Sequence, residues 1–525
     1  DKQARIAEER RLEAEENANK AIAAEKIADE RRVAAERAEA EAVKAKEEAE
    51  AAQLAEAEQR KQAEQARQQA IRNAEQARLY ALEAVKQADI AKANADLAEE
   101  QKQIAIKNAN EAMRQRYIAQ ARAMAVKSKE LNDPEQEALI AQQAFKFNNE
   151  HEGYIYDNDI YNGLYAALKK YDHPLTHSLE AHDRGAARTL VTVPGSKFIY
   201  SGGSDGKIIR WSEQNGQWKS DLLVTNTSYQ YYSMDISPDE KWLVAAGLAP
   251  ANELKNYVEL YSLTSMNSPK RIEGFKYAIE NVTFTGDGAG FYARDNSGYS
   301  IKFSDLTTVK EVITSTVKIN SIDVSSDGSK LAGAGDNGSL YIWDIRNNFS
   351  VTEIKNIGEH ITSVTIAPEG RRIIIGDNTG VVKIFDAQAS MVVRVLSGHS
   401  SAIEQIRFNH AGTFMATASK DKTVRLWNMN KLKEQPIVLS DHRDWVWSVA
   451  FTPDDEQLLA SIHSSTETVK GVEHTIHAWP TKIPTMSGIL CDMVKRNINK
   501  EEWEIFVGDD LPYESTCSAL PANNN

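Results

Sequence analysis

Two glycine-rich stretches of the 525-residue chain are the first candidates for phosphate chemistry. Residues 333–338 (Gly-Ala-Gly-Asp-Asn-Gly) have the G-x-G-x-x-G spacing, but a dinucleotide site needs a strand, a tight turn and a helix in that order. Here the glycines separate two short strand-like runs, which indicates a hairpin turn. Around Gly206-Lys207, Ser201 stands where a phosphate loop has its first glycine, and Ile208 stands where it has Ser or Thr. Neither stretch predicts a nucleotide site.

Histidine and carboxylate clusters do not match the spacing of a metal site. His463, His474 and His477 lie close in sequence, but no Cys or carboxylate at ligand spacing accompanies them. Residues 157–159 (Asp-Asn-Asp) start like a calcium loop, yet Asn162 stands in place of the required Gly. No Cys-His or Ser-His-Asp set can be assigned. We therefore expect no catalytic residue, no metal and no cofactor; an enzyme with an unusual site is the weakest alternative.

The residues after His173 are organised by a repeat of about 42 residues, and such a repeat decides the fold before any local motif does. A turn rich in Pro, Gly and Asp recurs seven times, as in residues 325–328 (Ser-Ser-Asp-Gly). Each unit is typical of one blade, so residues 173–480 predict an all-β, seven-bladed β-propeller. An aromatic residue ends a strand-like run in every unit, at Trp211, Tyr261, Phe303, Trp343, Phe385, Trp427 and Trp479.

The sixth unit, residues 397–427, resembles a WD repeat. In that family a His, a Ser or Thr, an Asp and a Trp form a hydrogen-bonded chain across the blade. The resemblance assigns these structural roles to His399, Ser419, Asp421 and Trp427.

The first unit matches this pattern less well. His182, Asp205 and Trp211 align with the family residues, but Gly203 stands where Ser419 does in the sixth unit. We therefore expect an incomplete hydrogen-bonded chain in the first blade.

The ring is expected to close when the last blade borrows a strand from the beginning. Residues 175–179 precede His182 as strand-like runs precede His399 and His442 elsewhere. This alignment predicts that they pair with residues 474–479, which would remove an open sheet edge.

Propellers of this family commonly bind partners around the central channel, near the start of each innermost strand. Trp445, with Arg443 and Asp444 beside it, is the expected anchor, because exposed Trp and Arg dominate interface energies. Tyr229 and Tyr231 extend this candidate face. The alternative is that Trp445 packs against the next blade. Alignment of the units gives one equivalent ring of positions, namely Gly185, Gln230, Ala278, Lys318, His360, Ala402 and Trp445.

Residues 1–119 have the pattern of a helical rod. Between Ala7 and Ala119 every seventh residue is Ala except Glu56, and such a repeat keeps one stripe of a helix facing a partner. We expect a coiled coil with close axes; the alternative is a solvated single helix with i,i+4 ion pairs. A hairpin is disfavoured because no Gly or Pro interrupts the segment. The second seam position and its larger neighbours are Ala81, Ala88, Ala95, Ala109, Ile90, Leu97, Ile104 and Ile118.

A helical neck, residues 120–172, is expected between the rod and the propeller. Asp133-Pro134-Glu135 predicts a helix start, and a further helix is expected from about Asp159 to Lys170. The tail, residues 481–525, should hold a helix from Gly488 to Arg496. Both cysteines of the chain lie in this tail, and from the residues alone they could be bridged or reduced.

The order of Cys491, Arg496-Asn497, Glu502-Trp503, Pro512-Tyr513 and Cys517 resembles the tail of many bacterial WD-repeat proteins. Over the whole chain, the order of rod, neck, propeller and tail resembles the C-terminal half of Bacteroidetes STAND NTPases. The resemblance implies that the two cysteines pair or lie close together. It also implies an ATPase upstream of Asp1 and, in many relatives, a membrane helix.

The charge balance disfavours nucleic acid as a partner, because 62 basic and 76 acidic residues give a net charge of −14 without a basic block. No apolar run approaches the roughly 18 residues of a membrane span, so we expect no direct membrane insertion. A cytoplasmic location is the default, with a tether upstream of Asp1 left open.

Taken as a whole, the sequence predicts a non-enzymatic recognition and scaffold region. Its propeller would bind a protein or peptide, on a helical spacer that can form a homo-oligomer through the coiled coil. Binding would regulate an upstream NTPase or effector module. The alternative is a structural protein whose rods assemble and whose propellers pack laterally.

Overall fold

A computed structural model describes most of the chain, and its described residues form two compact units. One unit lies within residues 1–124 and 146–153, and the other within residues 125–145 and 154–525. No helix of the described residues is long and apolar enough to cross a bilayer. The described residues are 27, 30–44, 63–179, 182, 187–192, 195–214, 217–250, 255–266, 268–442, 444–463 and 476–523.

Helix α2 (Ala63–Ser128) supplies most of the first unit, together with a helical segment at residues 30–44. The expected second seam is exposed at Ala81, Ala88 and Ala95 and half-buried at Ala109. The least exposed line of the helix is instead the predicted heptad stripe, which is half-buried or buried at Ala77, Ala84, Ala91, Ala98, Ala105 and Ala112. A narrow row of small side chains is therefore the covered face of α2.

The expectation of an unbroken rod falls partly outside the described residues. Residues 1–26 and 45–62 lie outside the described residues, so the expectation that the segment forms no hairpin is not tested there. The coiled coil therefore stays a prediction.

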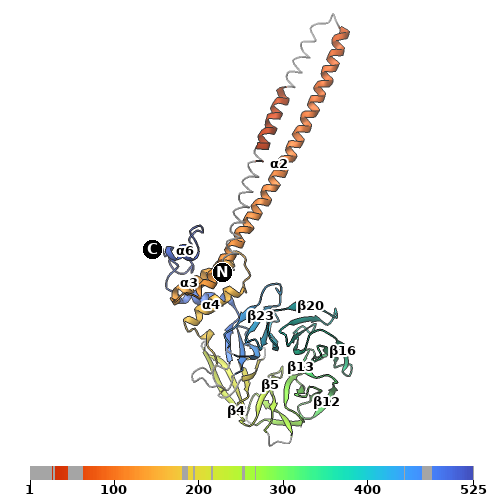
Figure 1. Cartoon of the computed structure of the whole chain (residues 1–525), viewed down its shortest axis with the longest axis vertical. Helices are drawn as coiled ribbons and strands as arrows, with labels where there is room; N and C mark the ends of the chain where they lie inside the picture. Colours follow the sequence, from red (N-terminus) through yellow and green to blue (C-terminus); the bar gives the residue numbers. More distant parts are fainter. Residues whose placement is uncertain are drawn as a thin grey trace. The chain divides into compact units, whose positions relative to one another are not determined.

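Seven antiparallel sheets follow one another around the ring of the propeller, and Figure 1 shows them around a common centre. The first three blades are β1 (Ala187–Thr192), β2 (Ile199–Gly203), β3 (Lys207–Gln214) and β4 (Gln217–Thr225); β5 (Gln230–Ile236), β6 (Trp242–Leu248), β7 (Asn256–Ser262) and β8 (Lys270–Phe275); and β9 (Ile279–Phe284), β10 (Phe291–Asp295), β11 (Ser300–Ser304) and β12 (Val309–Thr314). The next two are β13 (Ile319–Val324), β14 (Lys330–Gly335), β15 (Leu340–Asp344) and β16 (Ser350–Ile354); and β17 (Ile361–Ile366), β18 (Arg372–Asp377), β19 (Val382–Asp386) and β20 (Met391–Leu396). The last two are β21 (Ile403–Phe408), β22 (Phe414–Ser419), β23 (Val424–Asn428) and β24 (Ile437–Leu439); and β25 (Val446–Phe451), β26 (Gln457–Ile462) and β27 (Ile476–Pro480). The predicted seven-bladed propeller is confirmed.

The two sequence markers of the repeat have distinct structural roles. Each recurring aromatic lies on the third strand of its blade, where six of the seven are buried and Phe303 is partly buried. The recurring turn joins the first two strands and needs a left-handed backbone at one position, which glycine adopts without a Cβ penalty. Five blades place Gly there, for example Gly328 with φ 64°, while Glu240 and Asp455 adopt the same conformation.

The ring closes as expected between its two ends. Leu179 forms an antiparallel bridge with Ile476, donating its backbone N–H to the Ile476 carbonyl at 2.8 Å. The innermost strands contact one another in order around the ring, and β25 contacts β1. The pairing expected at His474 lies outside the described residues.

The neck helices and the tail pack against each other, and the neck also contacts the last strand of the propeller. Helix α3 (Pro134–Glu150) begins at Pro134 as predicted, α4 (Asn158–Lys170) matches the expected third helix, and η1 (Pro174–Thr176) is a short 3-10 turn. Tyr161 of α4 donates its hydroxyl hydrogen to the Pro480 carbonyl at 2.9 Å. This bond ties the neck to the last strand of the propeller.

The tail helices differ from expectation in their position. Helix α5 spans Ile483–Met493 rather than Gly488 to Arg496, because a proline in its first turn suits a helix start and Val494 is extended. Helix α6 (Lys500–Phe506) begins with a capping box in which the Asn499 side chain and Glu502 exchange hydrogen bonds.

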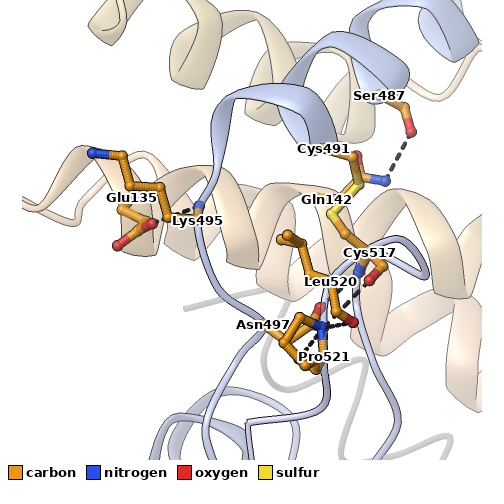
Figure 2. The surroundings of a disulfide bond; sticks show 9 residues. All are labelled: Glu135, Gln142, Ser487, Cys491, Lys495, Asn497, Cys517, Leu520 and Pro521. Carbon is orange, nitrogen blue, oxygen red and sulfur yellow. Dashed lines mark hydrogen bonds between the residues drawn. A yellow bond between two sulfur atoms is a disulfide. The ribbon is translucent and has the colours of Figure 1, made fainter.

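A disulfide joins Cys491 and Cys517, so the pairing implied by the family resemblance is confirmed. Figure 2 shows its surroundings, where the Gln142 amide of α3 donates to the Ser487 hydroxyl at 2.9 Å. The Asn497 amide donates to the carbonyls of Leu520 and Pro521 at 3.0 and 2.9 Å. The disulfide and the Asn497 bonds therefore hold the two halves of the tail together, while the Gln142 bond joins the tail to α3.

Candidate functional site at the channel mouth

Seven side chains, one from each innermost strand, line a cavity of about 330 Å³ in the centre of the propeller. In every blade the pairing of the first two strands shifts at the same point, which marks a β-bulge. A bulge leaves one residue out of the ladder and turns its side chain away from the sheet. We call the seven bulge residues the channel mouth: Arg188, Tyr232, Glu280, Asn320, Thr362, Glu404 and Trp447.

Arg188 lies between two aromatic rings of the channel mouth. Its guanidinium carbon is 4.7 Å from the Tyr232 ring centroid and 4.9 Å from that of Trp447. Stacking of this kind favours the cation and holds the planar guanidinium in one orientation. Among the described residues no carboxylate lies within 4.0 Å of Arg188, so its charge has no ion-pair partner there.

The two carboxylates of the channel mouth already have partners. Glu280 pairs with the buried Arg294 at 3.0 Å, and Glu404 pairs with Lys420 at 3.1 Å. Burial raises the pKa of Glu404, and burial lowers the pKa of Arg294, because both charged forms lose solvation. Each pair offsets part of that cost.

Arg407 connects the channel mouth to a second cavity of about 210 Å³ further along the channel. That cavity is also lined by the carboxylates of Asp235 and Asp323, which are half-buried. Burial raises the pKa of Asp235 to about 6 and raises that of Asp323 as well. Each carboxylate accepts a backbone N–H of the next blade, from Phe284 and Ile366 respectively, both at 2.7 Å.

Trp445 forms an aromatic rim next to the channel mouth. It is 39% exposed, and its ring centroid lies 6.2 Å from that of Trp447 and 5.0 Å from the Lys420 ammonium. His463 contacts both tryptophan rings and bonds to the Asp444 carboxylate at 2.8 Å. Trp445 therefore keeps an open face, and its ring contacts are with its own blade and with Lys420 of the sixth blade rather than with the next blade.

The predicted ring of partner-binding residues lies beside the channel mouth rather than on it. Gln230 and His360 are exposed and Lys318 is half-buried, each two residues before the bulge residue of its blade. Arg443 lies outside the described residues. The predicted positions therefore precede the residues that line the cavity by two residues and do not line it themselves.

Tyr229 and Tyr231 were wrongly expected on the face. Both are fully buried, and their hydroxyls donate to the Tyr257 carbonyl at 2.7 Å and to the Glu259 carboxylate at 2.6 Å. Their partners lie on β7, the third strand of the same blade, so these side chains point into the blade rather than into the channel. They support the second blade and cannot meet a partner.

The hydrogen-bonded chain of the sixth blade runs through Thr417 rather than Ser419. The Thr417 hydroxyl lies 2.8 Å from His399 Nε2 and accepts the indole N–H of Trp427 at 3.0 Å, while His399 Nδ1 lies 2.8 Å from Asp421. Ser419 instead donates to the Ser401 carbonyl at 3.0 Å. The two positions lie on the same face of β22, and only the earlier one faces the tryptophan.

This correction also makes the first blade complete. Ser201 is equivalent to Thr417, and its hydroxyl lies 2.8 Å from both His182 Nε2 and Trp211 Nε1. The expected gap at Gly203 therefore does not interrupt the chain. In the seventh blade Ala460 takes this position, and His442 Nε2 is left without a hydrogen-bond partner among the described residues.

The described residues contain no group of three or more His, Cys, Asp or Glu side chains placed to hold a metal ion. His474 lies outside them. His477 stacks on Trp479, at 5.5 Å between ring centroids, within the last blade.

A sequence signal for the channel mouth exists within the repeat. In each repeat an apolar residue comes before the bulge residue, and a residue that is either small and polar or an amide comes after it. This three-residue pattern differs from the simple alternation of apolar and polar residues along the rest of the strand. The seven residues after the bulge are Thr189, Ser233, Asn281, Ser321, Ser363, Gln405 and Ser448.

Comparison with known proteins supports the repeat. Four segments match the WD40 family, described as WD domain, G-beta repeat, at residues 174–212, 307–344, 390–428 and 433–470. The chain thus carries WD40 repeats in a seven-bladed propeller.

Individual relatives align with about half of the chain. The chain is similar to the protein LST8 homolog of Drosophila melanogaster, at 24% identity over 48% of this chain and 82% of that one. It is also similar to the target of rapamycin complex subunit LST8 of Bos taurus, at 22% identity over 48% of this chain and 80% of that one. The U3 small nucleolar RNA-associated protein 12 of Saccharomyces cerevisiae is 27% identical over 47% of this chain, which spans 30% of that protein.

Among solved structures, the WD40 beta propeller domain of Doa1 aligns with a TM-score of 0.49 and 18% identity, over 59% of this chain and 97% of that one.

Proposed function

We propose that this chain is a protein-binding scaffold whose propeller takes a partner at the channel mouth and the rim of Trp445. The observation that carries this proposal is that the exposed face of Trp445 lies next to the polar cavity of the channel mouth. Binding energy concentrates in aromatic and arginine side chains at the centre of an interface. WD40 propellers generally act as platforms without catalytic activity. A relative that is named as a complex subunit agrees with this role.

A display screen with the full 525-residue chain tests the proposal. Peptides or protein fragments selected on the wild-type chain are measured again on Trp445→Ala, with Tyr80→Ala of α2 as a matched exposed aromatic outside the propeller. We expect at least about a tenfold loss of affinity for Trp445→Ala and none for Tyr80→Ala. Equal affinities for both variants would exclude this face as the binding site.

The helical unit is proposed to act as a spacer that also assembles. Its covered alanine stripe leaves Ile90, Leu97 and Ile104 about half exposed at seven-residue spacing, a row that a second helix could cover. The same row favours the alternative role as a structural protein whose rods associate. Sedimentation velocity of the full chain and of residues 125–525 distinguishes the spacer role from the structural role. A structural protein requires extended assemblies of the full chain, whereas a spacer requires only a closed oligomer.

The wider context is also a proposal. The order of the tail motifs resembles that of bacterial WD-repeat proteins that follow a STAND NTPase, whereas the relatives compared above are eukaryotic. We propose that partner binding at the channel mouth regulates such an upstream module. Measuring nucleotide hydrolysis by the natural full-length protein, with and without Trp445→Ala, tests this regulation.

The location of the chain is proposed from the disulfide. Disulfides persist mainly in oxidising compartments, so a bonded Cys491 and Cys517 favour such a compartment over the cytoplasmic default. Alkylation of intact cells before lysis, followed by mass spectrometry, distinguishes bonded from free cysteines.

A further inference from the structure

The charges of the channel mouth do not balance among themselves. Glu280 is paired with Arg294 and Glu404 with Lys420, so both carboxylates are neutralised by close cations. Arg188 and Arg407 line the same cavity and form no ion pair within 4.0 Å among the described residues. At longer range Arg407 interacts with the carboxylates of Asp235 and Asp323, and Arg188 interacts with that of Glu404. The lining of this cavity holds three arginines, Arg188, Arg294 and Arg407, and two carboxylates, and Arg188 is the arginine that no close carboxylate neutralises.

The unpartnered hydrogen-bonding groups of the cavity are all donors. Arg188 Nε, Arg294 Nε and Trp447 Nε1 are buried without a hydrogen-bond partner among the described residues. Arginine and tryptophan side chains have no acceptor atom, so only a ligand that supplies acceptors can satisfy them. Arg294 is 4% exposed and lines the cavity beside Glu280, which makes its free donor a built feature rather than a surface one.

The stacking of Arg188 sets the geometry of such a ligand. The Tyr232 and Trp447 rings lie 4.7 and 4.9 Å from the guanidinium carbon, so we expect a ligand to reach the guanidinium at an edge that the rings leave open. That edge carries parallel N–H groups whose spacing matches the two oxygens of a carboxylate.

We propose that the channel mouth binds a carboxylate of the partner protein, received by the edge of Arg188 with Arg407 behind it. This inference rests on the proposed function and names the chemistry of its ligand. The carboxylate has two sources, an Asp or Glu side chain within an extended segment or a free C-terminus. Arg188 is the one arginine of the lining without a close carboxylate, so a segment with one carboxylate among neutral residues fits the cavity.

Pools of eight-residue peptides probed with the full chain test the proposal. One set is acetylated and amidated with a single central Asp or Glu, a second has a free C-terminus and no acidic residue, and a third is acetylated and amidated with a central Lys or Arg. We expect the first or the second set to bind about tenfold more strongly than the third. The stronger of the two identifies the source of the carboxylate.

Three variants locate the effect. Arg188→Gln is expected to abolish the preference for a carboxylate, Arg188→Lys to retain part of it, and Trp447→Phe to weaken it while keeping an aromatic ring. Arg346→Gln is the matched control, because Arg346 is 68% exposed and does not line the cavity. Circular dichroism melts confirm that each variant is folded.

Two results would overturn the inference. One is stronger binding of the Lys or Arg pools, and the other is an unchanged preference in both Arg188→Gln and Trp447→Phe. If peptides bind without regard to charge but lose affinity in Trp445→Ala, the proposed function stands and only the carboxylate is wrong. If no pool binds and Trp445→Ala changes nothing, both fail.

Discussion

The backbone N–H of Leu190, on the first innermost strand, donates to the hydroxyl of Ser448, on the last, at 3.1 Å. The same kind of bond occurs at six of the seven junctions between blades, each from a backbone N–H to the side chain that follows the neighbouring bulge. The other five pairs are Met234 to Thr189, Val282 to Ser233, Ile322 to Asn281, Val364 to Ser321 and Val449 to Gln405. The bonds link neighbouring innermost strands to one another and fix the backbone position next to the channel-mouth residues.

Replacing Ser448 with alanine should loosen this ring. The substitution leaves the buried Leu190 N–H without its acceptor and removes the bond from Ser448 to the Gln405 side chain at 2.8 Å. We expect the free energy of unfolding in urea to fall by about 1 to 3 kcal/mol. Ser350→Ala, at an exposed position of β16, is the control. A loss no larger than that of the control would show that the bond does not stabilise the ring.

Thr417→Val tests the corrected hydrogen-bonded chain of the sixth blade. Valine keeps the shape but leaves His399 Nε2 and the Trp427 indole N–H unpaired inside the blade. The expected cost is about 2 kcal/mol or more in urea unfolding. Ser201→Ala in the first blade should cost a similar amount, since Ser201 holds the same two partners there. A neutral effect of both would contradict a structural role for the chain.

Stability should fall in mildly acidic solution because of His442. Burial lowers the pKa of His442 to about 4 from an ordinary value of 6.5, so between these values the unfolded chain binds more protons than the folded one. Its contribution is complete above pH 6.5 and decreases as the pH falls toward 4, by on the order of 3 kcal/mol in total. Asp235, with its pKa raised to about 6, acts in the opposite direction between its unfolded value and pH 6.

The comparison of wild type with His442→Gln isolates this effect from Asp235. Urea unfolding at pH 7.5, 6, 5 and 4.5 should show a smaller loss of stability in the variant. Parallel pH profiles for the two proteins would mean that His442 titrates normally in the folded state.

Removing the disulfide should loosen the tail and spare the propeller. With a sequence separation of 26 between the paired cysteines, Cys491→Ser with Cys517→Ser is expected to cost about 3 kcal/mol of local stability. Hydrogen exchange should rise in α5 and α6 and stay constant in β9 to β20. Gln142→Ala, which removes only the bond from α3 to Ser487, should have a smaller effect. If hydrogen exchange in α5 and α6 is the same with and without the disulfide, polar contacts alone hold the tail.

Leu97→Glu tests the role of the exposed row on α2. Leu97 is 49% exposed and lies between Ile90 and Ile104 in the heptad spacing. If rods associate through this row, a buried charge should shift the full chain toward smaller species in sedimentation velocity. Glu99→Lys on the same helix also changes a charge but lies outside the row. An unchanged distribution in Leu97→Glu would remove this row as an interface.

Much of the fold was determined by periodicity. The seven aromatics and seven turns indicate seven blades, because every blade must bury one large residue on its third strand and reverse direction at one left-handed position. The seven-residue spacing of alanine likewise identifies the stripe of α2 that the structure covers. Each repeat meets these requirements with its own nearby residues. The same features therefore recur in every repeat, and the number of blades follows from the sequence.

The identity of the site residues required the tertiary structure. Thr417 and Ser419 lie on the same face of one strand, and only the position of Trp427 across the blade decides which of them joins the chain. Tyr231 and Tyr232 are neighbours, yet Tyr231 is buried against Glu259 and Tyr232 lines the channel, because Tyr232 is the bulge residue and is left out of the ladder. Arg188 becomes a candidate carboxylate site only when closure of the ring brings Trp447 beside it, about 260 residues later in the chain. Local spacing in a sequence specifies strands, turns and repeats, whereas the meeting of side chains from opposite ends of the ring depends on how all seven blades pack.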